Sequence, residues 1–217
     1  MKRLLLLSSG LTYLLKFIDQ DPKQTNMLFI PTAGNLDKDV WWIDKDRDVL
    51  HKMGFKITEL DIANASTKDM EDALSSTNLV YVAGGNTFYL LNQLRVSGFD
   101  KLLTDYVNNG GLYAGASAGA LVAGPDIGSI SSIDEPEKVE GLTSTKALGF
   151  VDIVPIPHYD MKERTQPIDR ITAKYGKDNE LVIITDDQAI LVEEDNWQVV
   201  NSGRSPLELE WFRKNNL

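Results

Sequence analysis

Short apolar runs that alternate with amphipathic stretches are the feature that most constrains how this chain can fold. The runs are apolar on both faces of an extended strand, which is typical of a parallel sheet covered by helices on both sides. The expected strands are residues 3–8, 27–31, 55–60, 78–82 and 111–115. The expected helices are residues 11–19, 40–53, 66–75, 87–95 and 99–108. The first 125 residues therefore predict an α/β fold with a mostly parallel sheet.

The second half of the chain has a different pattern. Residues 125–145 are rich in Gly, Ser, Asp and Glu and predict a long surface loop, followed by a strand-like run at 147–156. A helix is expected over 161–175, although Pro167 disturbs its first turns. Three short runs, 181–185, 188–193 and 196–201, predict a meander that adds antiparallel strands to the sheet.

Length and composition indicate one domain over residues 1–217, because 217 residues with 42% hydrophobic side chains can bury one large core. Leu4 to Leu7 form too short an apolar run for a signal peptide, and no segment reaches the roughly 20 apolar residues of a membrane span. The formal net charge of −10 disfavours binding to nucleic acid or to an anionic membrane, since both need a basic surface.

The chain contains no Cys and only two His. The lack of Cys excludes disulfides, thiolate metal sites and cysteine nucleophiles, and it fits a reducing compartment, so we expect a cytoplasmic protein. A zinc site would need both His51 and His158 or a set of carboxylates, which disfavours zinc chemistry. No metal and no cofactor are expected.

The sharpest motif is Gly-Ala-Ser-Ala-Gly at residues 115–119, between an expected strand and an apolar helical stretch. This is the context of a nucleophile elbow, in which a tight turn projects the serine hydroxyl above the end of the strand. The motif predicts that Ser117 is a nucleophile. The alternative is a strand–helix turn whose small residues only allow close packing.

A serine nucleophile needs a base to take its proton. His158 directly follows an expected strand, whereas His51 lies in a charged helical pattern and is expected to be solvated. Sites in open α/β sheets form outside the carboxyl ends of the strands, which favours His158. The acid that would orient His158 is left open by the residues alone. The candidates are Asp126, Asp134, Glu135, Glu137, Glu140 and Asp152.

A second glycine turn, Ala-Gly-Gly-Asn-Thr at residues 83–87, also joins a strand to a helix. Free backbone N–H groups in such a turn can bind an anion. The turn lacks the Lys and the spacing of a phosphate loop, so half of an oxyanion hole is the better interpretation. A plain tight turn with Asn86 or Thr87 as helix cap is compatible with it.

Together, the Ala-Gly-Gly-Asn-Thr-Phe turn, the Gly-x-Ser-Ala-Gly-Ala elbow and the later Pro-His-Tyr resemble the dipeptidase E and cyanophycinase family of serine peptidases. The resemblance spans about residues 27 to 160. It implies a flavodoxin-like sheet related to class I glutamine amidotransferases. It also implies exopeptidase activity, in dipeptidase E on peptides with an N-terminal aspartate.

The resemblance implies roles for individual residues. Ser117 matches the nucleophile and His158 the base, and the backbone N–H groups of Gly85 and Ala118 match the oxyanion donors. The family's Asp-x-Pro implies Asp134 as the third triad member. Glu135 is its substitute, because the loop here is slightly longer.

Two positions depart from the family's common motifs. Ala83 stands where the turn often has Gly, and Ala116 stands where the elbow often has Trp. The second difference changes the wall beside the nucleophile and bears on which side chain the site accepts.

The motifs and the resemblance together predict a serine peptidase that hydrolyses short peptides. The resemblance implies N-terminal aspartate as one substrate, for which Lys162, Arg164 or Arg170 is a candidate cation; a solvated helix face is the alternative for these three. An esterase or amidase with the same triad is the first alternative. A flavodoxin-like binding protein with a decayed site is the second. The partner is expected to be a short peptide, and the protein a monomer or a homodimer.

Overall fold

The computed structural model describes residues 1–217 and contains a seven-stranded sheet. Its first five strands in space are parallel, and β8 and β9 are antiparallel additions beside β1. The spatial order is β3 (Lys56–Glu59), β2 (Asn26–Ile30), β4 (Leu79–Val82), β5 (Leu112–Ala116), β1 (Arg3–Leu7), β8 (Gln188–Glu193) and β9 (Asn196–Asn201). From β3 to β5 this follows the flavodoxin-like 2-1-3-4 order, and β1 takes the fifth place.

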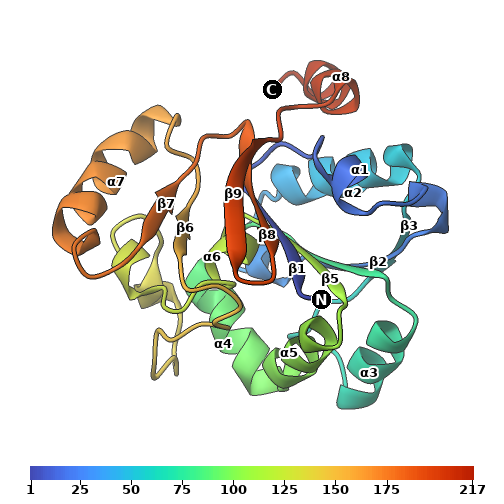
Figure 1. Ribbon diagram of the computed structural model, residues 1–217, viewed down its shortest axis with the longest axis horizontal. Coiled ribbons are helices and arrows are strands. Elements are labelled where there is room, and N and C mark those ends of the chain that lie inside the picture. Colours follow the sequence, from blue (N-terminus) through green and yellow to red (C-terminus); the bar gives the residue numbers. More distant parts are fainter.

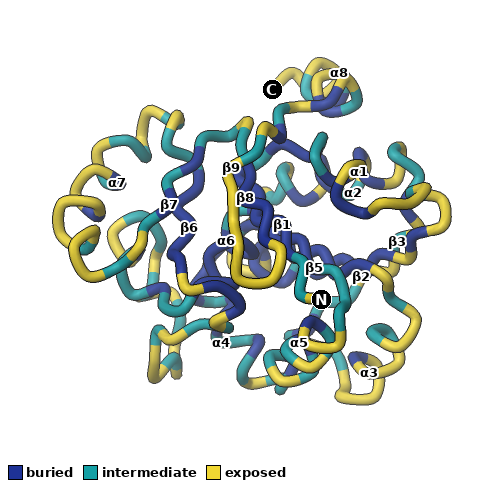
Figure 2. The backbone as a smooth tube through the Cα atoms, in the orientation of Figure 1, coloured by how far each residue is buried: buried dark blue, intermediate teal, exposed yellow.

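Helices cover both faces of this sheet (Figure 1). Along β1, Leu5 and Leu7 pack into one buried cluster and Leu4 and Leu6 into the other, because side chains alternate across a strand. One face carries α1 (Leu14–Phe17), α2 (Trp41–Met53) and α8 (Pro206–Asn215). The other carries α3 (Thr67–Ser75), α4 (Thr87–Ser97) and α5 (Phe99–Asn108). The central strands are buried on both sides (Figure 2), as the apolar runs predict.

Helix boundaries follow local chemistry. Ser66 caps α3 through a capping box with Asp69, and the Asn86 side chain accepts from the Tyr89 N–H at the start of α4. Gly54 ends α2 with a φ of 106°, in the left-handed region where glycine has no steric cost. Of the two caps expected for the helix after the glycine turn, Asn86 or Thr87, the structure has Asn86.

The C-terminal part corrects the predicted meander. The strands β6 (Val154–Ile156) and β7 (Leu181–Ile183) pair in parallel with each other and form a separate two-stranded sheet. Only β8 and β9 join the main sheet. The helix α7 (Lys162–Tyr175) connects β6 to β7 and makes a crossover unit, the kind of connection that two parallel strands need, whereas the meander would have required antiparallel neighbours.

Two helices also differ from expectation. The helix α1 has four residues instead of the nine in 11–19, and α8 lies where no helix was predicted. The expected loop 125–145 is largely irregular, with short 3-10 turns at Gly128–Ile130 and Pro136–Lys138. No helix is both long and apolar enough to span a membrane.

Candidate active site

The elbow at Ser117 joins β5 to the short helix α6 (Ala118–Leu121). Ser117 has φ 51° and ψ −108°, a strained backbone conformation for a residue with a side chain. A Cβ on Gly115 would lie 2.2 Å from the Gly119 carbonyl oxygen, and one on Gly119 would lie 2.2 Å from the Val82 oxygen. The buried Tyr113 hydroxyl donates to the Gly119 carbonyl at 2.6 Å. The small flanking residues therefore allow the sharp turn that presents Ser117.

His158 lies directly beside Ser117. Its Nε2 is 2.9 Å from Ser117 Oγ, and its Nδ1 is 2.6 Å from Asp186 Oδ1. An ionised carboxylate only accepts hydrogen bonds, so Nδ1 carries the proton and Nε2 is free to accept from the serine hydroxyl. The structure thus brings the predicted pair together and adds Asp186 to it.

The parallel pairing of β6 and β7 places His158 next to Asp186. Ile156 is opposite Ile183 in the register, His158 comes two residues after Ile156, and Asp186 comes three residues after Ile183. Both loops leave the same edge of the small sheet because parallel strands end at the same edge. His158 itself has a φ of 68°. The site therefore contains two residues with a side chain and a positive φ, Ser117 and His158.

Ser8, the first residue after β1, supports this arrangement. Its hydroxyl accepts from the His158 backbone N–H at 2.9 Å and donates to Asp186 Oδ1 at 3.0 Å. The Ser117 N–H donates to the carbonyl of Leu7, so β1 lies against the elbow as well. Ser8 is therefore the point where the main sheet holds the loops of the small sheet.

The pKa of Asp186 lies below its ordinary value. Burial raises it, but the hydrogen bond and charge of His158, the Ser8 hydroxyl and the charge of Arg204 lower it further than burial raises it. The His158 and Asp186 side chains are only 18% and 20% exposed. Asp186 is therefore held in its ionised form, as an acceptor for His158.

Asp134 and Glu135 do not lie against His158, which corrects the prediction for the third group. The Asp134 carboxylate accepts from the Thr87 N–H at 2.8 Å, and Glu135 forms an ion pair with Lys138. Both belong to the loop that covers the start of α4. Sequence reasoning missed Asp186 because it searched only between Ser117 and His158. One signal in the sequence could have found it: Asp186 directly follows the apolar run 181–185, just as His158 follows the run 147–156.

Asp134 nevertheless borders the site. Burial raises its pKa, although the bonds to Thr87 and the charge of Arg164 act in the opposite direction. Arg164 also donates to the Ile133 carbonyl. Of the three candidate cations, Arg164 is half-buried and borders this loop, whereas Lys162 and Arg170 are exposed.

The glycine turn packs against Ser117. A Cβ on Gly84 would lie 3.0 Å from Ser117 Cβ and 3.6 Å from Ser117 Oγ. Gly85 has a φ of 148°, and a Cβ there would lie 2.2 Å from the Ala33 carbonyl oxygen. The backbone N–H groups of Gly85 and Ala118 donate to no acceptor within the protein. Two free donors therefore flank the serine, from the turn after β4 and from the start of α6.

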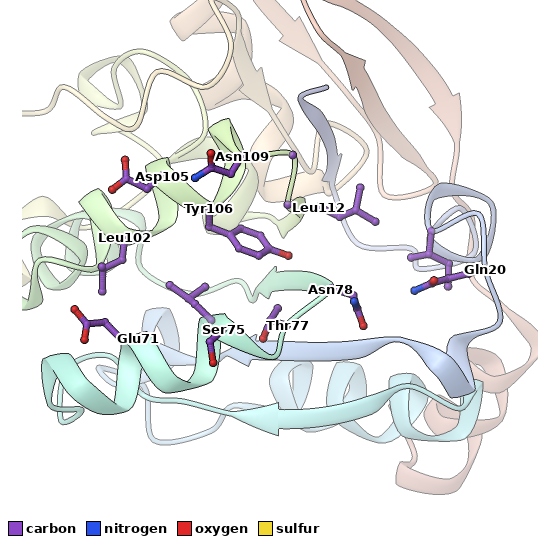
Figure 3. A pocket seen from close by; sticks show the side chains of 14 residues that line it. Gln20, Glu71, Ser75, Thr77, Asn78, Leu102, Asp105, Tyr106, Asn109 and Leu112 are labelled. Atoms are coloured by element: carbon purple, nitrogen blue, oxygen red, sulfur yellow. The ribbon is translucent and has the colours of Figure 1, made fainter.

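The remaining candidate sites lie elsewhere. His51 is exposed on α2. A cavity of about 660 Å³ is formed where residues such as Thr77, Asn78 and Gly111 lead into β4 and β5 (Figure 3). That is the amino end of these strands, whereas Ser117 follows the carboxyl end, where sites in open α/β sheets form. The cavity is therefore separate from the serine site.

Comparison with known proteins places the chain in a family. The model of peptidase family S51 matches residues 4–200. The chain belongs to peptidase family S51. An uncharacterized peptidase of Listeria innocua is 38% identical over 77% of this chain and 80% of the relative, and Peptidase E of Shigella flexneri is 31% identical over 83% and 75%.

The fold of this S51 family peptidase agrees with that of a solved relative. A crystal structure from Listeria monocytogenes, provisionally described as Peptidase E, superposes with a TM-score of 0.84 at 32% identity, over 93% of this chain and 98% of that one. The predicted relationship to Peptidase E and the predicted α/β fold are thereby confirmed.

Proposed function

We propose that this peptidase is a serine exopeptidase that uses Ser117, His158 and Asp186 as a catalytic triad. The observation that carries the proposal is the hydrogen-bonded chain from Ser117 Oγ to His158 Nε2 and from His158 Nδ1 to Asp186 Oδ1. In a triad the serine attacks, the histidine transfers the proton and the buried acid orients the imidazole and stabilises its charged form.

The reaction follows from this geometry. His158 Nε2 takes the hydroxyl proton while Ser117 Oγ bonds to the scissile carbonyl carbon, and the resulting oxyanion accepts from the N–H groups of Gly85 and Ala118. His158 then gives its proton to the leaving amine as the carbon–nitrogen bond breaks. Water, activated in turn by His158, hydrolyses the acyl-enzyme and releases Ser117.

The substrate we propose is a short peptide, with N-terminal aspartate as a preferred first residue. The side chain of such a substrate needs a cation, and Arg164 is the best placed of the three candidates because it is half-buried at the loop that covers the glycine turn. A guanidinium can hold a carboxylate with two parallel hydrogen bonds. Residue 116 is Ala, so any preference rests on such polar contacts more than on an aromatic wall at that position.

The test is the hydrolysis of amides with Asp, Asn, Leu or Ala at the N-terminus by the wild type and by Ser117→Ala. We expect the wild type to cleave the Asp series best. The variant should keep its fold and lose about 10⁵–10⁶ in kcat, the scale known for removal of a serine nucleophile. Unchanged turnover in Ser117→Ala would refute the triad. Cleavage of nitrophenyl esters without cleavage of any amide would point to an esterase instead.

A further inference from the structure

Trp42, in the first turn of α2, is hydrogen-bonded to the glycine turn beside Ser117. Its indole Nε1–H donates to the Gly84 carbonyl oxygen at 3.2 Å. The turn and the helix are far apart in sequence, so only the folded chain brings them together. The steps of the proposed mechanism do not involve the Trp42 side chain directly.

The contact acts on one peptide unit. In a trans peptide the C=O of one residue and the N–H of the next lie in one plane and point in opposite directions. The carbonyl that Trp42 binds is therefore in the same rigid unit as the Gly85 N–H. When the indole holds the Gly84 oxygen, it also sets the direction in which the Gly85 N–H points.

This peptide unit needs such a constraint. It joins two glycines, and without a Cβ on either side many orientations of the unit are sterically open. Beyond it, the turn is held by the Asn86 N–H, which donates to the Ala33 carbonyl at 2.8 Å, and by the close approach of Gly85 to Ala33. Those contacts hold Gly85 in place, whereas the bond from Trp42 is to the carbonyl of the unit itself.

We infer that Trp42 is a positioning residue for the oxyanion hole: its indole N–H holds the Gly84–Gly85 peptide so that the Gly85 N–H points toward the acyl carbonyl oxygen at Ser117. The inference rests on the proposed serine mechanism. A donor matters most when charge develops on that oxygen, so the contribution of Trp42 belongs to the transition state rather than to substrate binding.

The test uses a fluorophosphonate probe, which reacts with an activated serine and needs no knowledge of the natural peptide. We expect the rate constant for labelling of Ser117 to fall about tenfold in Trp42→Phe, the scale of one hydrogen bond, and less than the ~10²–10³ of a lost oxyanion donor. On a cleaved aspartyl amide, kcat should fall by a similar factor while KM stays the same.

The variant Trp42→His distinguishes the contribution of the N–H donor from that of the apolar ring surface. The histidine Nε2, like the tryptophan Nε1, is two bonds from Cγ, so the variant restores a donor in about the same place with less apolar surface. At pH 8, above the ordinary pKa of about 6.5, the ring is neutral. We expect Trp42→His to label faster than Trp42→Phe, although Phe preserves the packing better. A purely structural role predicts the reverse order.

The matched control is Trp41→Phe, because Trp41 is the neighbouring indole and its ring nitrogen makes no hydrogen bond within the protein. It should label at the wild-type rate. Equal rates in wild type and Trp42→Phe, or a slower Trp42→His, would overturn the inference and leave the triad standing. A wild type that is not labelled at Ser117 would overturn both. Melting temperatures check that each variant is folded.

Discussion

The elbow around Ser117 and the pair formed by His158 and Asp186 are built in opposite ways. The elbow is a local structure: residues 115–119 make the turn, and its neighbours are strands of the main sheet. The pair comes from two loops that are 28 residues apart and leave a separate two-stranded sheet. The difference teaches that a candidate nucleophile can be found from a short motif, whereas the acid proposed to act with it depends on which strands pair.

Polar contacts at Ser8 and at Ser117 join the two regions. Ser8 donates to Asp186 and accepts from the His158 N–H, and the Ser117 hydroxyl lies against His158. Both Ser117 and His158 have a positive φ. The elbow and the loop after β6 therefore each contribute one residue with a strained backbone to the contact between them. The alignment of the proposed triad therefore depends on contacts between two sheets rather than on either sheet alone.

The largest expected effect distinguishes Asp186 from the acids that the resemblance suggests. Asp186→Asn should lower kcat by about 10⁴, because the amide favours the wrong imidazole tautomer and cannot stabilise the charged ring. Asp134→Asn should cost about tenfold or less, since the amide oxygen can still accept from the Thr87 N–H. Steady-state kinetics on one amide compares them.

The control for this comparison is Asp187→Asn, the adjacent acid, whose carboxylate accepts from the Thr185 hydroxyl and not from His158. It should retain nearly full activity. A larger loss of kcat in Asp134→Asn than in Asp186→Asn would contradict the assignment of Asp186. It would indicate that Asp134, in the loop that covers α4, is the acid that acts with His158.

A smaller effect is expected where the two sheets meet. Ser8→Ala removes one donor to Asp186 and one acceptor for the His158 N–H, so kcat should fall about tenfold with little change in KM. Ser9→Ala is the matched control, because the Ser9 hydroxyl makes no hydrogen bond within the protein and only the Ser9 backbone carbonyl accepts one. Equal kinetics for the two variants would show that Ser8 does not align the triad.

The smallest effect concerns stability at acidic pH. The folded-state pKa of Asp186 lies below that of the unfolded chain, since the hydrogen bonds and charges around it outweigh its burial. Its ionised form therefore stabilises the fold above the ordinary carboxyl pKa of about 4, and this contribution is lost as the pH falls through the lower folded-state value. Urea denaturation of wild type and Asp186→Asn between pH 3 and 7 measures it.

The difference in the free energy of unfolding between the two proteins should shrink as the pH falls through this window. Asp134 provides the opposite case, because burial raises its pKa, so its ionisation opposes folding as the pH rises. Asp134→Asn should therefore gain stability relative to the wild type toward neutral pH. If the stabilities of Asp186→Asn and Asp134→Asn relative to the wild type changed with pH in the same direction, the opposite pKa shifts of the two carboxyl groups would be contradicted.

The sequence by itself determined what depends on neighbours along the chain. Short apolar runs separated by amphipathic stretches specified a parallel sheet with helices on both faces. The motifs singled out Ser117, His158 and the glycine turn as candidate site residues. The tertiary structure alone decided the pairing of β6 with β7, and with it the place of Asp186 and the bond from Trp42 to Gly84. The physical reason is that a short apolar strand can pair with several partners, and the choice depends on the packing of the whole chain.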